Sequence, residues 1–109
     1  MACPISRRAA KRDIRPVSAD EMSRLYDELR RIQLDTYRYR DQPDASPRRL
    51  GFIIDDTAAP EAIDPSGDRV DLYGYLSMAV AAVQIPAREI EELKARLRAV
   101  EGSCARPAR

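Results

Sequence analysis

The chain has 109 residues, of which 44% are hydrophobic and 34% are charged, and its formal net charge is +1. This length fits one small domain with a modest core, and a near-neutral chain gives no global reason to expect binding to nucleic acid or to a membrane surface. Two cysteines, Cys3 and Cys104, and the absence of histidine exclude a disulfide framework, a zinc site and histidine-dependent catalysis. We therefore expect no metal and no cofactor. Because no apolar run could span a bilayer, we expect no membrane partner, and the default location is the cytoplasm.

The N-terminal segment, residues 1–17, is basic. Its cations are Arg7, Arg8, Lys11, Arg12 and Arg15. Residues 55–71 carry six acidic side chains, so the two segments could attract each other within one chain or between chains. A basic arm could also contact nucleic acid, but no aromatic side chain is interleaved with these cations, which makes a nucleic-acid partner the least favoured reading.

A capped helix opens the central segment, residues 18–84. Ser18 is followed three residues later by Glu21, which is the spacing of a capping box, and an apolar stripe continues at helical intervals. The pattern predicts a helix that begins at Ser18 and fades near Gln33.

Two short antiparallel strands are expected after this helix. Polar and apolar residues alternate over residues 34–40, and a short apolar run over residues 50–54 predicts a second, more buried strand. A turn lies between them, and residues 55–69, which are acidic and contain proline and glycine, predict a loop. The expected fold class is therefore α+β.

The last third of the chain carries an aliphatic ladder that steps by four and three residues in turn. Its members are Leu72, Leu76, Ala79, Val83, Pro86, Ile90, Leu93, Leu97 and Val100. This spacing makes a narrow coiled-coil-like seam that requires a partner helix. The residue types allow either a dimer or a trimer.

Pro86 is expected to kink or restart the helix, because proline lacks the backbone N–H that a helix interior uses. We therefore expect Asp71 to cap a helix over residues 72–84 that packs on its own domain. Residues 85–101 would form the free seam, Gly102 would end it, and residues 102–109 would be a disordered tail.

One pair of residues could carry chemistry. Without histidine, the fold-independent way to activate a serine is a neutral lysine acting as the base, and Ser6 and Lys11 lie five residues apart. Spacing of this kind also arises by chance in a solvated basic segment, so the sequence leaves both readings open.

Six short segments resemble, in order, the motifs of one family. They are residues 6–14, 36–40, 51–53, 60–63, 70–72 and 82–84. The first is similar to a signature Ser-Asp-x-Arg-Leu-Lys-x-x-Ile, the third to the start of Gly-Phe-Ile-Ala-Gln-Glu-Val, and the fourth to Pro-Glu-x-Val. The family is the peptidase S74 group, the intramolecular chaperone domain at the C-terminus of phage tailspikes, tail fibres and endosialidases, with a related domain in myelin regulatory factors.

The resemblance implies a homotrimer that templates the folding of a trimeric fibre or tailspike passenger in cis and then releases itself by self-cleavage. By the same resemblance, Ser6 is the catalytic nucleophile and Lys11 its general base, in a single-turnover serine endopeptidase. Before release such a domain would be part of a virion or of a bacterial surface fibre. Only five residues precede Ser6, so a passenger would require a longer chain. The alternative is a non-catalytic module that only trimerises.

Overall fold

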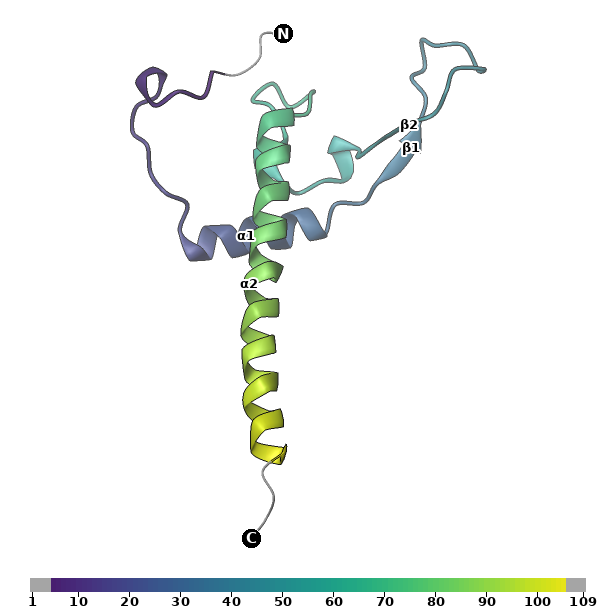
Figure 1. The fold of residues 1–109 in the computed structure, drawn as a ribbon. Helices are drawn as coiled ribbons and strands as arrows, with labels where there is room; N and C mark the ends of the chain where they lie inside the picture. The colour runs from purple at the N-terminus through teal and green to yellow at the C-terminus, as the bar shows by residue number, and fades with distance from the viewer. Residues whose placement is uncertain (1–4, 106–109) are drawn as a thin grey trace.

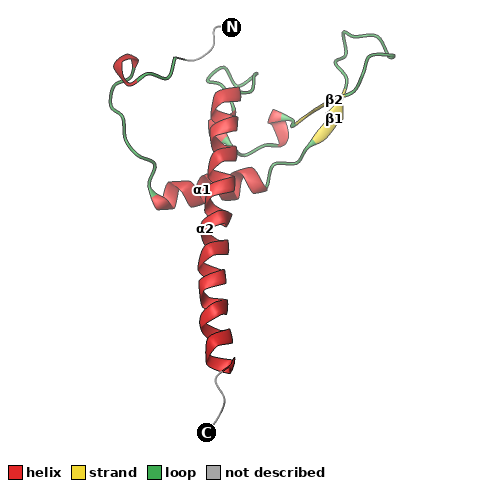
Figure 2. Ribbon diagram, viewed as in Figure 1, coloured by secondary structure: helices red, strands yellow, loops and turns green. Residues whose placement is uncertain are grey.

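The computed structural model describes residues 5–105 and shows a small α+β fold built on one long helix (Figures 1 and 2). In chain order the elements are the 3-10 helix η1 (Arg8–Ala10), α1 (Ala19–Arg30), β1 (Asp35–Tyr37), β2 (Arg49–Gly51), the 3-10 helices η2 (Ile54–Asp56) and η3 (Pro60–Ala62), and α2 (Leu72–Ala105). Figure 1 shows α1 crossing the upper half of α2, with the N-terminal arm on one side and the β-hairpin on the other. The molecule extends over 77 × 43 × 21 Å.

The first helix begins where the capping box predicts. The Ser18 hydroxyl accepts a hydrogen bond from the Glu21 N–H at 3.1 Å, which satisfies one of the free donors of the first turn. Asp20 and Glu21 add negative charge at the positive end of the helix dipole. The helix ends at Arg30, slightly earlier than the predicted fade near Gln33.

The two strands pair antiparallel, as predicted, but each is only three residues long. Thr36 faces Leu50 at the centre of the register. Beside this short ladder, arginine side chains bond backbone carbonyls: Arg48 Nη2 donates to the Thr36 carbonyl at 2.8 Å, and Arg38 Nε donates to the Ser46 carbonyl at 2.8 Å. The expectation of a buried strand over residues 50–54 is wrong, because Leu50 is exposed and the strand ends at Gly51.

The long helix is continuous through Pro86, so the expected restart at this position is wrong. The missing N–H and the proline ring cost about 3 kcal/mol in a helix interior. The helix continues because the turns before Pro86 are fixed to the core through Met78 and Ala81, and strong helix formers follow. Among residues 5–105 no helix is both long and apolar enough to cross a bilayer.

The helix also passes Gly102, the residue expected to end it, and runs to Ala105. The tail predicted for residues 102–109 is therefore wrong for its first part, and residues 106–109 lie outside the described range. Asp71 does cap the start, as predicted, because its Oδ1 accepts from the Gly74 N–H at 2.8 Å. Asp71 and Ala105 thus delimit one helix instead of two.

The core lies where α1 and the η2–η3 loop meet the upper half of α2. Its buried members are Phe52, Ala59, Ala62 and Met78, with Leu25, Leu29, Ile32, Ile54, Val70 and Tyr75 packed around them. The Phe52 and Tyr75 rings meet edge to face, with centroids 5.0 Å apart. Leu25 and Leu29 lie on one face of α1, and Ile32 follows just after its end.

Two apolar stripes run side by side along the upper half of α2. The stripe that packs on the core contains Tyr75, Met78 and Ala81, whereas the ladder residues Leu72 and Val83 are 68% and 69% exposed. The expectation that the first half of the ladder packs on its own domain is therefore wrong. The ladder is open to solvent on both sides of Pro86.

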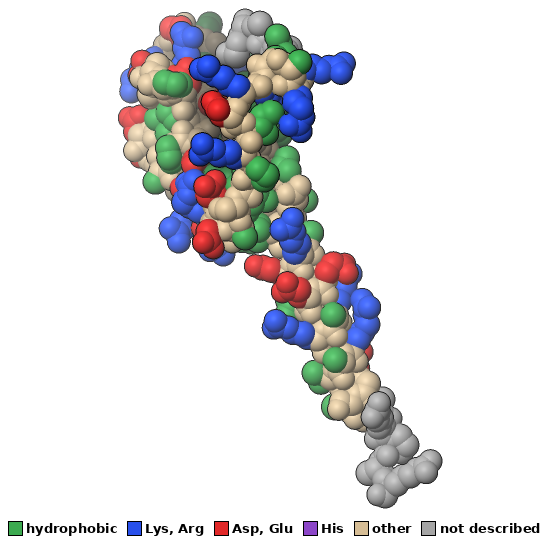
Figure 3. Space-filling view, turned by 90° about the vertical axis from the view of Figure 1, so that its left-hand side faces the viewer, with side chains coloured by type: hydrophobic (Ala, Val, Ile, Leu, Met, Phe, Trp, Pro, Cys, Tyr) green, Lys and Arg blue, Asp and Glu red, His purple; other side chains and the backbone are tan. Residues whose placement is uncertain are grey.

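The exposed surface of a single chain is large for its mass. It measures 9715 Å² at 12.3 kDa, against about 6,100 Å² expected for a compact monomer. The projecting half of α2 contributes to the excess, because every residue from Ala87 to Val100 is exposed. Figure 3 shows hydrophobic side chains spaced along this stalk between charged ones.

A close backbone approach fixes η3 against α2. A Cβ atom at Gly74 would overlap the carbonyl oxygen of Glu61 and would also press on the Asp71 carboxyl group at 3.2 Å. Only glycine allows this approach. At Gly102, by contrast, an added Cβ would meet nothing within 4 Å.

An ion-pair network joins α1 to η3 beside the same contact. Arg24 Nη1 donates to Glu61 Oε1 at 2.7 Å and to Glu28 Oε1 at 2.9 Å. Burial alone would raise the pKa of Glu61, but the hydrogen bonds from Arg24 and from its own backbone, with help from the Glu28 side chain, outweigh it and hold that pKa below its ordinary value.

We expect Gly74→Ala and Gly102→Ala to change stability in opposite directions. Both replace a helical glycine, which in open space gains about 0.5–1 kcal/mol. At residue 74 the overlap with Glu61 reverses the sign, and we expect a loss of about 1–3 kcal/mol. Urea unfolding followed by circular dichroism at one protein concentration measures both, and a gain at both positions would contradict the close approach.

The Glu61 network predicts a component of acid sensitivity. Because the pKa of Glu61 is lower in the folded chain, its stabilisation is present above the ordinary carboxyl pKa and is lost as the pH falls through the folded value. We expect Glu61→Gln to reduce the drop in the free energy of unfolding below about pH 4.5. Glu92→Gln, on the projecting stalk, is the matched control; an equal reduction in both variants would contradict a specific role for Glu61.

Candidate functional site

The N-terminal arm brings Ser6 and Lys11 together. The single turn of η1, closed by bonds from Ala10 N to Arg7 O at 3.0 Å and from Lys11 N to Arg8 O at 3.1 Å, shortens the path between them. Lys11 Nζ lies 2.8 Å from Ser6 Oγ, within hydrogen-bond distance. The pair that the sequence singled out is therefore in contact.

A third polar group, a hydroxyl from α2, completes the contact. The Tyr73 hydroxyl oxygen lies 3.2 Å from Ser6 Oγ, although the two residues are 67 positions apart. Sequence reasoning missed Tyr73 as a site residue, because no motif or spacing relates it to the arm. The available signal was its place two residues after the helix cap Asp71, where the start of α2 is fixed.

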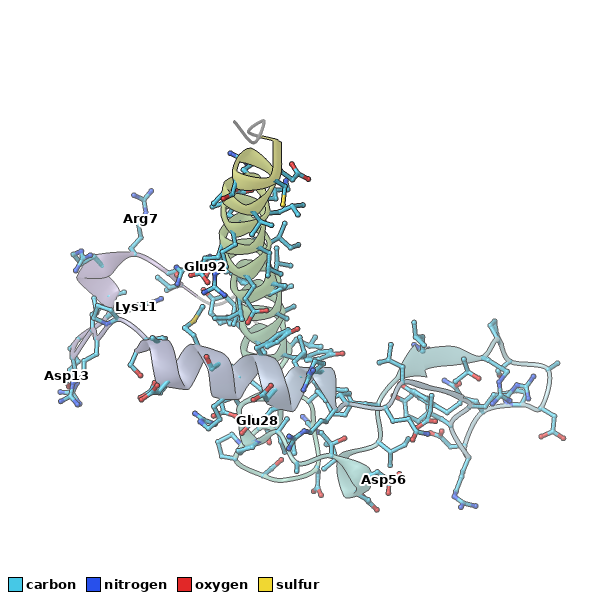
Figure 4. The ribbon with its side chains drawn as sticks, turned by 90° about the horizontal axis from the view of Figure 1, so that it is seen from below. Arg7, Lys11, Asp13, Glu28, Asp56 and Glu92 are labelled. Atoms are coloured by element: carbon cyan, nitrogen blue, oxygen red, sulfur yellow. The ribbon has the colours of Figure 1, made fainter. Side chains whose placement is uncertain are left out.

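The pair lies at the surface, in a basic setting. Ser6 and Lys11 are both exposed, and no ion pair joins Lys11 to a carboxylate within residues 5–105. Figure 4 shows Arg7, Lys11 and Asp13 on the arm, apart from Glu28 and Asp56. Asp13 has a φ of 55°, a left-handed conformation that turns the chain just after Lys11 and that aspartate tolerates better than most residues.

The expected attraction between the basic arm and the acidic loop is not seen within one chain. In the described part of the molecule, the ion pair of the arm is the exposed contact of Arg12 with Asp13 at 3.9 Å. Glu61 of the acidic loop instead pairs with Arg24 of α1. The charges of the arm are therefore open to other partners.

The chemistry available at the arm is proton transfer between an amine and a hydroxyl. A neutral lysine amine can accept the serine proton, and the resulting alkoxide is a nucleophile. Residues 5–105 contain no group of three or more cysteine, aspartate or glutamate side chains placed to hold a metal ion, and Cys3 lies outside the described range.

The exposed ladder is the second functional feature. Seven of its members are half or more exposed: Leu72, Leu76, Val83, Ile90, Leu93, Leu97 and Val100. Because α2 continues past Gly102, Cys104 falls four residues after Val100, at the next position of the same ladder, and it is exposed with a free thiol. From here on, the seam means this whole exposed row on α2, from Leu72 to Cys104, and not residues 85–101 alone.

An apolar groove of about 580 Å³ adjoins the upper end of the seam. Leu29, Ile32 and Leu34 line one side, and Leu72, Tyr75, Leu76 and Ala79 of α2 line the other. Two seam residues, Leu72 and Leu76, are therefore also walls of this groove. The apolar surface of the seam widens where it reaches the domain.

Comparison with protein-family models, with curated proteins and with solved structures finds no match.

Proposed function

We propose that this chain is an S74-type intramolecular chaperone domain, which trimerises through the seam, assists the folding of a trimeric fibre-like passenger and releases itself by cleavage at Ser6. The observation that carries the proposal is the 2.8 Å contact between Ser6 Oγ and Lys11 Nζ. These are the two residues that the resemblance assigns as nucleophile and base, and a local turn folds them together.

The bond that breaks is the peptide bond between Ile5 and Ser6. Neutral Lys11 takes the hydroxyl proton as Ser6 Oγ attacks the carbonyl carbon of Ile5. Lys11 then gives this proton to the Ser6 nitrogen as the C–N bond breaks, which leaves Ile5 esterified to Ser6 Oγ beside a free amino group. Water hydrolyses the ester, which yields the Ile5 carboxyl group and restores the Ser6 hydroxyl.

Assembly would favour the neutral, reactive form of Lys11. A lysine accepts a proton only when it is neutral, and removal from water favours the neutral amine. In one chain Lys11 is exposed, so a neighbouring chain that covers the arm would favour the reactive form. Cleavage would then follow correct assembly, and because the reaction is intramolecular, placement alone can supply much of the acceleration.

The seam supports trimerisation independently of Ser6. Seven large aliphatic side chains at least half exposed along one helix cost free energy in water, and burial of each stabilises an assembly by about 1.5–3 kcal/mol. A non-catalytic trimerisation module is therefore the second candidate function, favoured by this surface alone.

To test cleavage, a trimeric β-rich passenger is fused upstream, and the products are identified by intact mass. We expect the wild-type chain to cut between Ile5 and Ser6. Ser6→Ala, Lys11→Ala and Lys11→Arg should cut at least about 10²-fold more slowly, because arginine keeps its proton. Ser23→Ala, at another exposed serine, and Arg12→Ala, at the cation next to Lys11, are the controls and should cut normally.

Two results would remove the catalytic claim. One is equal cutting in all variants, which would point to a contaminating protease. The other is no cutting of a wild-type fusion that light scattering shows to be trimeric, which would leave the non-catalytic module.

Cys104 reports on the assembly. In a Cys3→Ser background we expect a mass of three chains by light scattering. Mild oxidation should link two of the three chains, because parallel in-register helices bring their Cys104 thiols together. The control moves the thiol one residue off the seam, with Cys104→Ser and Ser103→Cys combined, and should link far less. A monomeric mass, or equal linking at both positions, would contradict a parallel seam.

A further inference from the structure

We propose that Tyr73 is a third catalytic group of the Ser6–Lys11 site, which donates its phenolic hydrogen to Ser6 Oγ as the serine loses its proton to Lys11. This inference rests on the proposed cleavage. It goes beyond it by assigning a residue from α2 that neither the arm nor the resemblance indicates.

Hydrogen-bond accounting fixes the direction of the Tyr73 contact in the reactive state. A serine hydroxyl has one hydrogen and two lone pairs. When Lys11 acts as a neutral base, the single hydrogen of Ser6 must point at Lys11 Nζ, 2.8 Å away. The Tyr73 hydroxyl, 3.2 Å from Ser6 Oγ, can then only donate. Its hydrogen bond becomes stronger as negative charge develops on the oxygen.

Tyr73 stands on a rigid support. Its backbone belongs to the first turns of α2, where Asp71 caps the helix, the Ser77 hydroxyl donates to the Tyr73 carbonyl at 2.8 Å, and Met78 is buried in the core. Ser6 and Lys11 lie on an arm with little support of its own. A functional hydroxyl on the helix can therefore position the nucleophile on the arm.

The Tyr73 contact is also the hydrogen-bonded link between the described arm and the domain. Within the described chain it is the only hydrogen bond between residues 5–17 and the helices and strands that follow. Removal of the phenolic oxygen should therefore weaken the stabilisation of negative charge on Ser6 Oγ and also change the position of Ser6. If Tyr73 had a purely structural role, only the position of Ser6 would change.

A thiol at residue 6 reports on charge stabilisation at this position without relying on cleavage. In a Cys3→Ser and Cys104→Ser background, Ser6→Cys places a titratable sulfur beside Lys11 and Tyr73. The rate of alkylation by iodoacetamide as a function of pH gives the thiol pKa. Adding Tyr73→Phe should raise this pKa by about half a unit to one unit, because a donor to the thiolate is lost. Tyr26→Phe, on α1, is the control and should leave it unchanged.

The cleavage assay then tests catalysis. Tyr73→Phe keeps the ring and should slow the first-order cutting of the passenger fusion by about ten-fold or more, while Tyr26→Phe should cut at the wild-type rate. Circular dichroism and light scattering on the same samples check that Tyr73→Phe remains folded and assembled.

The outcomes distinguish this inference from the proposed function. Normal cutting by Tyr73→Phe, or an unchanged thiol pKa, overturns the role of Tyr73 and leaves the Ser6–Lys11 proposal standing. No cutting by the assembled wild-type fusion overturns both, even if the thiol pKa responds to Tyr73. A slower rate together with a raised thiol pKa supports the assignment.

Discussion

The burial of Met78 at the crossing of α1 over α2 is the interaction on which the remaining structure depends. Met78 is 1% exposed and is the one large side chain that is fully buried among the described residues. Phe52 and the small residues Ala59 and Ala62 pack against it, so α1, the hairpin exit and η3 all converge on one turn of α2. The backbone of η3 can come close enough only because residue 74 is glycine. A core this small leaves the fold marginally stable as a single chain.

The same helix serves two surfaces at once, which explains its unusual composition. Between Leu72 and Pro86 it is apolar on the stripe that meets the core and on the neighbouring seam, whereas beyond Ala87 only the seam continues. A domain with a small core and a long exposed apolar row can gain stability by adding copies of itself. If copies assemble through the seam, as proposed, assembly and folding would draw on the same helix.

Local signals were predictable from the sequence, and contacts between distant segments were not. Ser18 and Asp71 cap their helices as expected, because capping depends on residues within one turn. The expected restart of the helix at Pro86 was wrong, because tertiary packing of the preceding turns outweighs one lost hydrogen bond. The ladder was recognised, but the assignment of its first half to the core was wrong, since Met78 and Ala81 form a second stripe beside it. The contact of Ser6 with Lys11 follows from a short turn, whereas Tyr73 comes from a segment that no local pattern connects to it.

The distance along the chain between Ser6 and Tyr73 sets an order of events during synthesis. The arm leaves the ribosome first, and the helix that carries Tyr73 follows 67 residues later. At about 5–20 residues per second, this delay lasts several seconds. During that interval Ser6 and Lys11 are present without the Tyr73 hydroxyl group and without most of the exposed seam. Under the proposed function, a passenger made before the arm would have this time to begin folding before the cleavage site is complete.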